Sequence, residues 1–327
     1  MNAEQIECVF CGENALESIY RESSRNKLTL APILDYKISK AEFSEPGRIL
    51  KCKKCDFVFS VPGFSEEALN YAYERMADAD YVSEEKGRRL QAQTILSTIH
   101  KFKHKGSLLD IGCGAGFFIH EARKSGWEVM GIEPSRWACT FARDRLGLQV
   151  INDFFPSNEL LERQFDVVVM LDTIEHLLDP ERALMIAKMI LKDGGILYVS
   201  TPDIDSFMSR ALGARWWGIN PYHLFYFSKS TLSRMLKKNG FAPIQFTSHP
   251  RFFSVPYLLR RLKVYSFFFG WLFNGISNFS VVKDRIVKVP NKDQIHILAK
   301  KEESQSFAKI HTSKIPNTDE RNFQAVS

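Results

Sequence analysis

The stretch from residue 107 to residue 133, SLLDIGCGAGFFIHEARKSGWEVMGIE, limits the fold more than any other part of the chain. It begins with a short apolar run, Ser107–Ile111, and passes through a glycine-rich turn, Gly112–Gly116. A segment of helical character follows to Lys124, and then a second apolar run, Trp127–Ile132. Strand, glycine turn, helix and strand in this order predict the first half of a nucleotide-binding α/β sheet.

Two acidic residues frame this unit and indicate its ligand. Glu133 ends the second strand, 21 residues after Gly112, where a carboxylate can accept hydrogen bonds from a ribose diol. The third glycine of the turn, Gly116, comes one residue earlier than in the dinucleotide fingerprint, and Phe117 takes the fingerprint position. Asp110, just before the turn, suits a ligand with an ammonium group better than a pyrophosphate.

The pattern D-x-G-x-G-x-G, with an acid after the next strand, resembles the class I S-adenosylmethionine (SAM)-dependent methyltransferases. The resemblance covers about residues 65–300 and implies an α/β fold: a Rossmann-like, seven-stranded, mostly parallel sheet with an antiparallel last strand. It implies SAM as the cofactor. The residues that it places near SAM are Asp110, Gly112, Cys113, Gly114, Gly116, Glu133, Pro134, Asp153, Leu171, Asp172, Tyr81 and Arg88.

Some of these positions have a purely structural alternative. For Asp153 a loop-capping function is an equal alternative, and Cys113 and Cys139 are expected to be small core residues. Tyr81 and Arg88 lie on a segment predicted to be helical from Ser65 to about His100. On that segment a solvated helix face is favoured more for Arg89 than for Arg88.

Two further motifs indicate where methyl transfer would occur. Residues 172–180, DTIEHLLDP, resemble the loop after strand four in small-molecule methyltransferases. Residues 223–228, HLFYFS, resemble the acceptor loop of bacterial enzymes of the ubiquinone-pathway and sugar-modifying kind. The resemblance makes His223 the favoured catalytic base, with His176 or Glu175 as runner-up. A histidine that clamps the loop by hydrogen bonds is the structural alternative for His223.

Four of the six cysteines form two C-x-x-C pairs, Cys8 with Cys11 and Cys52 with Cys55, with 40 residues between the pairs. Two thiolates on one tight turn can reach the same metal ion, and two such turns complete a tetrahedron of sulfurs. The spacing predicts a closed, structural Zn²⁺ site near the N-terminus, since no coordination position is left for water.

These features divide the chain into parts. We expect a zinc-ribbon-like module at 1–62, a helical cap and linker at 63–105, and a methyltransferase domain at 106–300. That domain carries an aromatic and basic insert at 250–290, and a polar, disordered tail is expected at 301–327.

The insert is the least typical part. It holds nine aromatic residues between 252 and 273, and residues 264–282 carry no charge. Gly270, Asn274 and Gly275 in that run argue against a membrane span, although its length almost reaches one. Aromatic and basic residues together favour a peripheral membrane contact through 252–282. A lid on the core or a dimer interface is an equal alternative.

Composition sets few limits on the partner. The net charge of +6 permits an anionic partner without requiring one. The first ten residues lack the features of a signal peptide, so we expect a cytoplasmic protein, placed at the inner face of the membrane if the insert binds lipid.

The expected reaction is methylation, at oxygen or carbon, of a sugar or lipid-linked glycan. An RNA methyltransferase that binds RNA through the zinc module is one alternative, although Asn-Pro-Pro-Tyr, the signature of base-amine methylation, is absent. A SAM-binding scaffold without turnover is another. The oligomeric state stays open.

Overall fold

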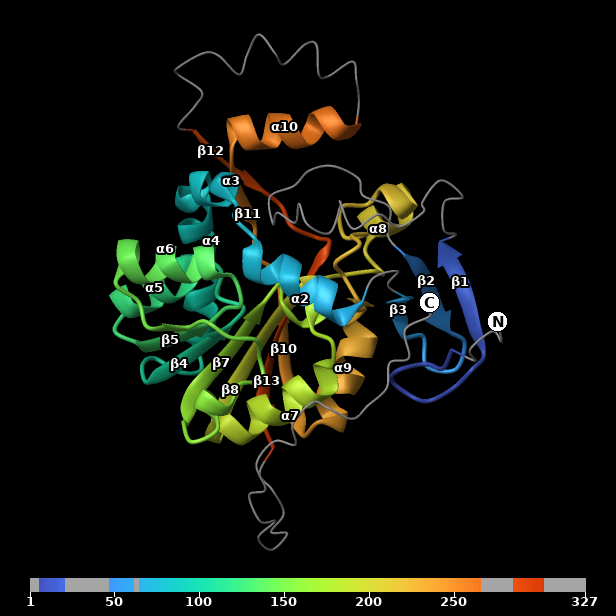
Figure 1. Cartoon of the computed structure of the whole chain (residues 1–327), viewed down its shortest axis with the longest axis horizontal. Helices are drawn as coiled ribbons and strands as arrows, with labels where there is room; N and C mark the ends of the chain where they lie inside the picture. The colour runs from blue at the N-terminus through green and yellow to red at the C-terminus, as the bar shows by residue number, and fades with distance from the viewer. Residues whose placement is uncertain (1–5, 21–46, 62–64, 266–284, 303–327) are drawn as a thin grey trace, which may run out of the picture.

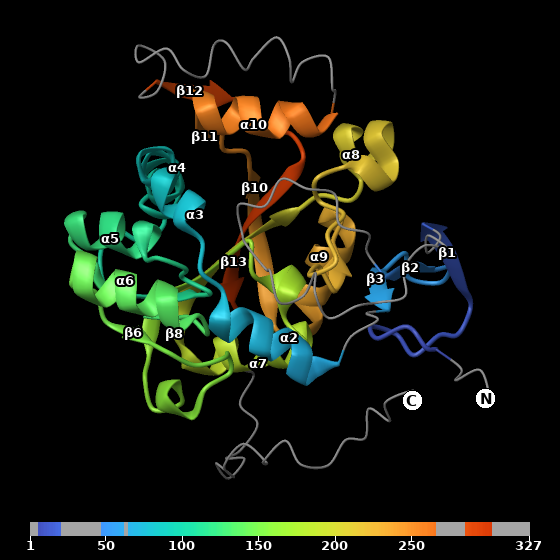
Figure 2. The same cartoon turned by 45° about the horizontal axis from the view of Figure 1, so that its top comes forward.

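The computed structural model describes residues 6–20, 47–61, 65–265 and 285–302 (Figures 1 and 2). Its centre is a seven-stranded sheet in which β13 alone runs antiparallel to its neighbours, β8 and β10. The predicted fold class is therefore confirmed. In spatial order the strands are β10 (Phe241–Thr247), β13 (Gln294–Lys301), β8 (Leu191–Pro202), β7 (Phe165–Leu171), β4 (Ser107–Ile111), β5 (Glu128–Ile132) and β6 (Val150–Ile151).

Helices cover both faces of this sheet, because the inner strands are apolar on both sides. On β7, Val167 and Val169 belong to one core cluster, whereas Val168 and Met170 belong to another. The first cluster includes α4 (Glu85–Ile99), α5 (Phe117–Lys124) and α6 (Arg136–Leu146). The second includes α2 (Glu66–Arg75), α7 (Pro180–Ile190) and α9 (Lys229–Lys238). Short elements on the connections are η1 (Asn158–Leu160), η2 (Ile174–His176), α8 (Phe207–Leu212) and η3 (Gly213–Arg215).

A small antiparallel sheet lies beside the large one (Figure 1). Its order is β1 (Leu16–Tyr20), β2 (Arg48–Cys52), β3 (Val58–Val61) and β9 (Phe225–Tyr226). The N-terminal cysteines lie next to its strands: Cys8 and Cys11 precede β1, Cys52 ends β2, and Cys55 lies on the turn that follows. The fourth strand comes from the acceptor loop of the methyltransferase part, about 160 residues later in the chain. The two parts also share one hydrophobic core, in which Phe57 packs on Phe225 and Phe227.

The prediction of one continuous helix from Ser65 to about His100 is wrong. The segment forms α2, α3 (Ala79–Ser83) and α4. Met76 leaves the helical conformation, with φ −54° and ψ 125°, and the Asp78 side chain accepts the Tyr81 N–H to start α3. This capping break turns the chain so that Tyr81 lies over the glycine turn.

The insert supplies β11 (Arg251–Ser254), α10 (Val255–Tyr265) and β12 (Ile286–Val289), with β11 paired to β12. It packs on α4, since the N–H and hydroxyl of Ser254 donate to the buried Glu84 carboxylate at 2.8 and 2.5 Å. Most of the predicted charge-free run and nearly all of the predicted tail fall outside the described residues. Within the described part of the chain, no helix is long and apolar enough to cross a membrane.

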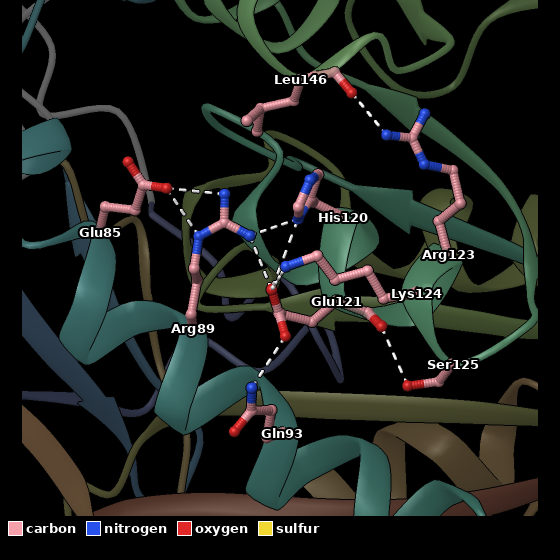
Figure 3. A network of polar contacts seen from close by, with 9 residues as sticks. All are labelled: Glu85, Arg89, Gln93, His120, Glu121, Arg123, Lys124, Ser125 and Leu146. Atoms are coloured by element: carbon pink, nitrogen blue, oxygen red, sulfur yellow. Dashed lines mark hydrogen bonds and ion pairs between the residues drawn. The ribbon is translucent and has the colours of Figure 1, made fainter.

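A network of polar contacts fastens α4 to α5 (Figure 3). The Glu121 carboxylate accepts hydrogen bonds from Arg89 at 2.6 Å, Gln93 at 2.8 Å and Lys124 at 3.3 Å. Arg89 also pairs with Glu85 and contacts His120, and its side chain is only 18% exposed. The expectation of a solvated Arg89 is therefore wrong. Burial alone would raise the pKa of Glu121, but these hydrogen bonds outweigh it and lower that pKa to about 2.

We expect Glu121→Gln to lower the free energy of unfolding at pH 7 by about 1–3 kcal/mol, because the charged acceptor of this network is lost. A depressed folded-state pKa stabilises the native protein fully above the usual value of 4.5, and that contribution disappears as the pH falls through about 2. The difference in free energy of unfolding between variant and wild type, measured with denaturant, should therefore be smaller at pH 3 than at pH 7.

Lys124→Gln is the matched control on the same helix. Its side chain is 60% exposed, so its loss should change stability by only about 0–1 kcal/mol. Equal stability of Glu121→Gln and wild type at pH 7 would contradict the assignment of this network as the clamp between α4 and α5.

Candidate active site

A cavity of about 600 Å³ opens at the carboxyl ends of β4, β5 and β7, which is the usual ligand position in an open α/β sheet. It is bounded by α2, the loops after β5 and β7, the acceptor loop and β11. Among the site residues predicted from the sequence, those that line it are Tyr81, Arg88, Gly112, Gly114, Glu133, Pro134, Asp153, Leu171, Asp172, Glu175, His176 and His223. Cys113 and Gly116 belong to the turn and Asp110 to the strand before it, and none of the three is among the residues that line the cavity.

Glu133 anchors the glycine turn as well as facing the cavity. Its two carboxylate oxygens accept the N–H groups of Gly114 and Ser135, each at 2.9 Å. Burial raises the pKa of Glu133, and these two hydrogen bonds partly oppose the shift. Because a carboxylate has about four acceptor positions, two remain for a ligand.

Asp110 is buried at the end of β4, and its Oδ1 has no hydrogen-bond partner among the described residues. Burial, and then the charge of Glu133, raise the pKa of Asp110 well above its usual range. Asp110 lies in the strand before the turn and is not part of the cavity wall.

Tyr81 and Arg88 cover the turn from the other side. The Arg88 guanidinium lies 3.6 Å from the centre of the Tyr81 ring, and its Nε donates to the Tyr81 carbonyl at 3.3 Å. The Tyr81 ring stacks on Phe117. The arginine is thus held by stacking and a backbone contact, and it brings a positive charge to the cavity.

The three predicted catalytic residues lie together. Glu175 and His176 belong to η2, directly after β7, and the ring of His223 meets that of His176 at 4.6 Å between centroids. The His223 Nδ1–H donates to the Gly218 carbonyl at 2.8 Å, as the structural alternative for this residue requires. This hydrogen bond leaves the Nε2 of His223 without a proton, so the same residue can hold the loop and still accept a proton.

Burial dominates the titration of this cluster. It lowers the pKa of His176 to about 4, and together with neighbouring His176 it lowers the pKa of His223 well below the usual range. Burial, and then Asp172, raise the pKa of Glu175 well above its usual range. Both imidazoles are consequently neutral at neutral pH.

Sequence reasoning missed a second polar group in the cavity. Arg251 of β11 stacks on Trp217 at 4.3 Å and approaches the Asp172 carboxylate at 3.9 Å. Gln294 of β13 bonds the same carboxylate. Arg251 falls in the predicted insert, whose composition indicated a surface contact, and no local pattern links it to Asp172.

The cysteine cluster has the geometry of a metal site. The four sulfur atoms of Cys8, Cys11, Cys52 and Cys55 lie within 4.8 Å of one another. The Sγ–Sγ distance is 3.6 Å both between Cys8 and Cys55 and between Cys11 and Cys52. Four sulfurs about 2.3 Å from a central Zn²⁺ would lie about 3.8 Å apart, so the thiols fit the ion. The residues after each pair, Gly12 and Asp56, have φ of 72° and 58°, which closes both turns.

The chain is similar in sequence to known methyltransferases. Residues 83–245 match a family described as a methyltransferase domain. The chain carries a class I SAM-dependent methyltransferase domain. It is 29% identical over 150 residues to a ubiquinone biosynthesis O-methyltransferase of Dinoroseobacter shibae, and 35% identical over 102 residues to one of Caulobacter vibrioides. These alignments cover 42% and 29% of this chain, and 60% and 40% of the relatives.

Among solved structures, the methyltransferase domain is similar to a SAM-dependent methyltransferase of Archaeoglobus fulgidus, at 23% identity and a TM-score of 0.46. That match covers 68% of this chain and 100% of the other. A second similar structure is the magnesium protoporphyrin IX methyltransferase of Synechocystis, at 12% identity and a TM-score of 0.40. It covers 66% of this chain and 80% of the other.

The methyltransferase turn needs glycine at its last position. Gly116 has φ +81°, and a Cβ there would lie 2.6 Å from Leu148 and 3.1 Å from Ala142. We expect Gly116→Ala to lower the free energy of unfolding by about 1–2 kcal/mol for the left-handed backbone and by about 1–3 kcal/mol more for overpacking. Thermal or denaturant unfolding measures the sum.

Gly126→Ala separates the two contributions. Gly126 has φ +88°, but a Cβ there meets nothing within 4 Å, so this variant should show the backbone cost alone. Equal losses in the two variants would mean that Gly116 is not packed against α6 as the structure describes.

Proposed function

We propose that this chain transfers the methyl group of SAM to an oxygen of a small-molecule acceptor. The observation that carries the proposal is a single cavity that joins the glycine turn and Glu133 to the cluster of His223, His176 and Glu175. A cofactor on one wall and acid–base groups on the other match a transfer between two bound molecules. The printed names of the relatives, which are O-methyltransferases, favour oxygen over carbon as the acceptor atom.

The residues of this chain would hold SAM at defined positions. Glu133 has two remaining acceptor positions for the ribose hydroxyls, and the glycines at 112 and 114 let the backbone approach the ligand. Arg88 offers a cation to the carboxylate of the methionine part, and Leu171 and Asp172 flank that part. Pro134 and Asp153 line the end where adenine would lie.

Bound SAM supplies an electrophilic methyl group and leaves as S-adenosylhomocysteine. The chain mainly has to align the acceptor with that methyl group and exclude water. Holding both reactants in a reactive geometry lowers the entropic part of the barrier. His223 is placed to receive or orient the acceptor hydroxyl through Nε2, since its Nδ1 is bound to Gly218. His176 and Glu175 lie next to it on the loop after β7.

The acceptor class is a sugar or a lipid-linked glycan in this proposal. Asn220 and Arg251 offer polar contacts to a hydroxylated molecule, and Phe252, Phe253 and Tyr257 line the cavity wall toward α10. A peripheral membrane contact through 252–282 would bring a lipid-linked acceptor to this wall. In the described part of that segment, Arg260 of α10 lies 3.9 Å from the Asp80 carboxylate, and its half-exposed side chain would meet anionic lipid from the solvent side.

We also propose that Cys8, Cys11, Cys52 and Cys55 hold one structural Zn²⁺. The cluster joins two distant turns, and the sheet that it supports contains β9 of the acceptor loop. The Arg234 side chain of α9 bonds the Cys55 carbonyl. The ion would therefore stabilise the acceptor loop as well as the N-terminal module.

Glu133→Gln should weaken SAM binding by about 1.5–3 kcal/mol, because the charged acceptor for the ribose hydroxyls is lost. Isothermal titration calorimetry with SAM measures the change. Glu128→Gln is the control, since Glu128 is exposed at the opposite end of the same strand and should bind SAM as wild type does. Wild-type affinity in a folded Glu133→Gln protein would refute the cofactor site.

Cys52→Ser should lower the zinc content from one ion per chain to none, measured by elemental analysis after purification under reducing conditions. It should also speed amide hydrogen exchange at Phe225 and Tyr226, because β9 depends on β3 for its pairing. Cys139→Ser is the control, since Cys139 is buried in α6 away from the cluster. A wild-type protein without zinc would overturn the assignment.

A further inference from the structure

A second group of metal-ligand residues lies inside the cavity. One donor atom from each of Glu175, His176 and His223 lies within 4.8 Å of the other two. All three side chains line the cavity that the glycine turn and Glu133 share. Two neutral imidazoles and one carboxylate form a common donor set for divalent transition metals.

In both histidine rings Nδ1 is bound to a backbone carbonyl, which leaves Nε2 for a metal ion. The Nδ1 of His223 lies 2.8 Å from the Gly218 carbonyl, and the Nδ1 of His176 lies 3.0 Å from the Tyr222 carbonyl. Since a carbonyl accepts, each Nδ1 carries the proton and each Nε2 keeps a lone pair. A backbone carbonyl on the other ring nitrogen is the usual orienting contact of metal-binding histidines.

Further contacts hold the His176 ring and the backbone of Glu175. The Tyr73 hydroxyl lies 2.9 Å from the His176 Nδ1, so α2 also holds this ring. The Leu224 N–H donates to the Glu175 carbonyl at 2.8 Å, which ties η2 to the residue after His223. The two rings and the loop that carries Glu175 are therefore held in place by the protein's own contacts.

Glu175 is the observation that points to a ligand. Its side chain is 1% exposed, and neither carboxylate oxygen has a hydrogen-bond partner among the described residues. A buried polar group without a partner costs about 1–3 kcal/mol, more when it is charged. A cation that binds Glu175 together with the two histidines removes that cost.

We infer that Glu175, His176 and His223 bind a divalent cation, and that this cation receives the hydroxyl of the acceptor. The inference deepens the proposed function and rests on it for the identity of the acceptor site. With its Nε2 on the cation, His223 would orient the hydroxyl through the cation and would not take the proton. Three protein ligands leave coordination positions open toward the cavity. An acceptor with its hydroxyl beside a second oxygen, such as a vicinal diol, fills two of them.

The cation would make the hydroxyl a better nucleophile by lowering its pKa, as bound divalent metals do for water. In the transfer, the acceptor oxygen forms a bond to the methyl carbon as the bond between sulfur and that carbon breaks. The sulfonium sulfur keeps the electron pair, and the hydroxyl proton leaves to water. The products are the methyl ether, S-adenosylhomocysteine and a proton.

Mn²⁺ is the probe that separates this site from the cysteine site. Imidazole and carboxylate ligands accept Mn²⁺, whereas four thiolates select Zn²⁺, so the full chain is loaded with one zinc before titration. Electron paramagnetic resonance then counts bound Mn²⁺ in the absence of SAM. We expect one Mn²⁺ per wild-type chain and at least tenfold weaker binding in Glu175→Gln and in His223→Gln.

Glu84→Gln is the matched control, because Glu84 is another buried carboxylate that lines the same cavity but bonds Ser254 instead. It should bind Mn²⁺ as wild type does. If Glu175→Gln fails to fold, His176→Gln provides the same measurement at a less buried ligand.

The outcomes distinguish the two claims. Wild-type protein that binds SAM but no Mn²⁺, or variants that bind Mn²⁺ as wild type does, would overturn the cation site and leave the proposed function intact. Wild-type protein that binds Mn²⁺ but not SAM would overturn the proposed function and, with it, the acceptor role of the cation.

Discussion

The backbone of Leu224 joins the two parts of this protein. Its N–H donates to the Glu175 carbonyl and its own carbonyl accepts the Ser60 N–H, both at 2.8 Å. One residue thus connects the loop after β7 with the edge of the cysteine-bearing sheet, and β9 extends that edge by pairing with β3. His223 is the preceding residue, so its position depends on both connections.

The two walls of the cavity differ in where they lie relative to the segment that matches the methyltransferase family. Its cofactor wall comes from the carboxyl ends of β4, β5 and β7, inside the segment that matches the methyltransferase family. Part of its acceptor wall comes from outside that segment: Tyr73 precedes residue 83, and Arg251 follows residue 245. The two walls of the cavity thus come from different parts of the chain.

Local patterns predicted the secondary structure around the glycine turn well. The glycine turn, the apolar strands beside it and the helix start at Ser65 depend on neighbours in sequence, and the structure has all of them. The four cysteines were brought together by their spacing, as expected. The break between α2 and α3 was missed because apolar and acidic residues continue across Met76–Asp78, where Met76 leaves the helical conformation and Asp78 caps α3.

Long-range pairings could not be predicted from such patterns. The two-residue strand β9 is too short to have a periodicity, and its partner lies far upstream. The ion pair of Arg251 with Asp172 depends on how the insert folds back over the sheet. The contact between His176 and His223 likewise follows from the path of two loops, although both residues were candidates on sequence grounds.

The central claim is that this cavity transfers methyl groups from SAM to a small molecule. Its most direct test is the transfer of radiolabelled methyl from SAM into a cell extract that is afterwards separated into aqueous, lipid and RNA fractions. The account predicts label in an aqueous or lipid small molecule with wild-type protein, and far less with Glu133→Gln. No label in any fraction, or label confined to RNA, would contradict it.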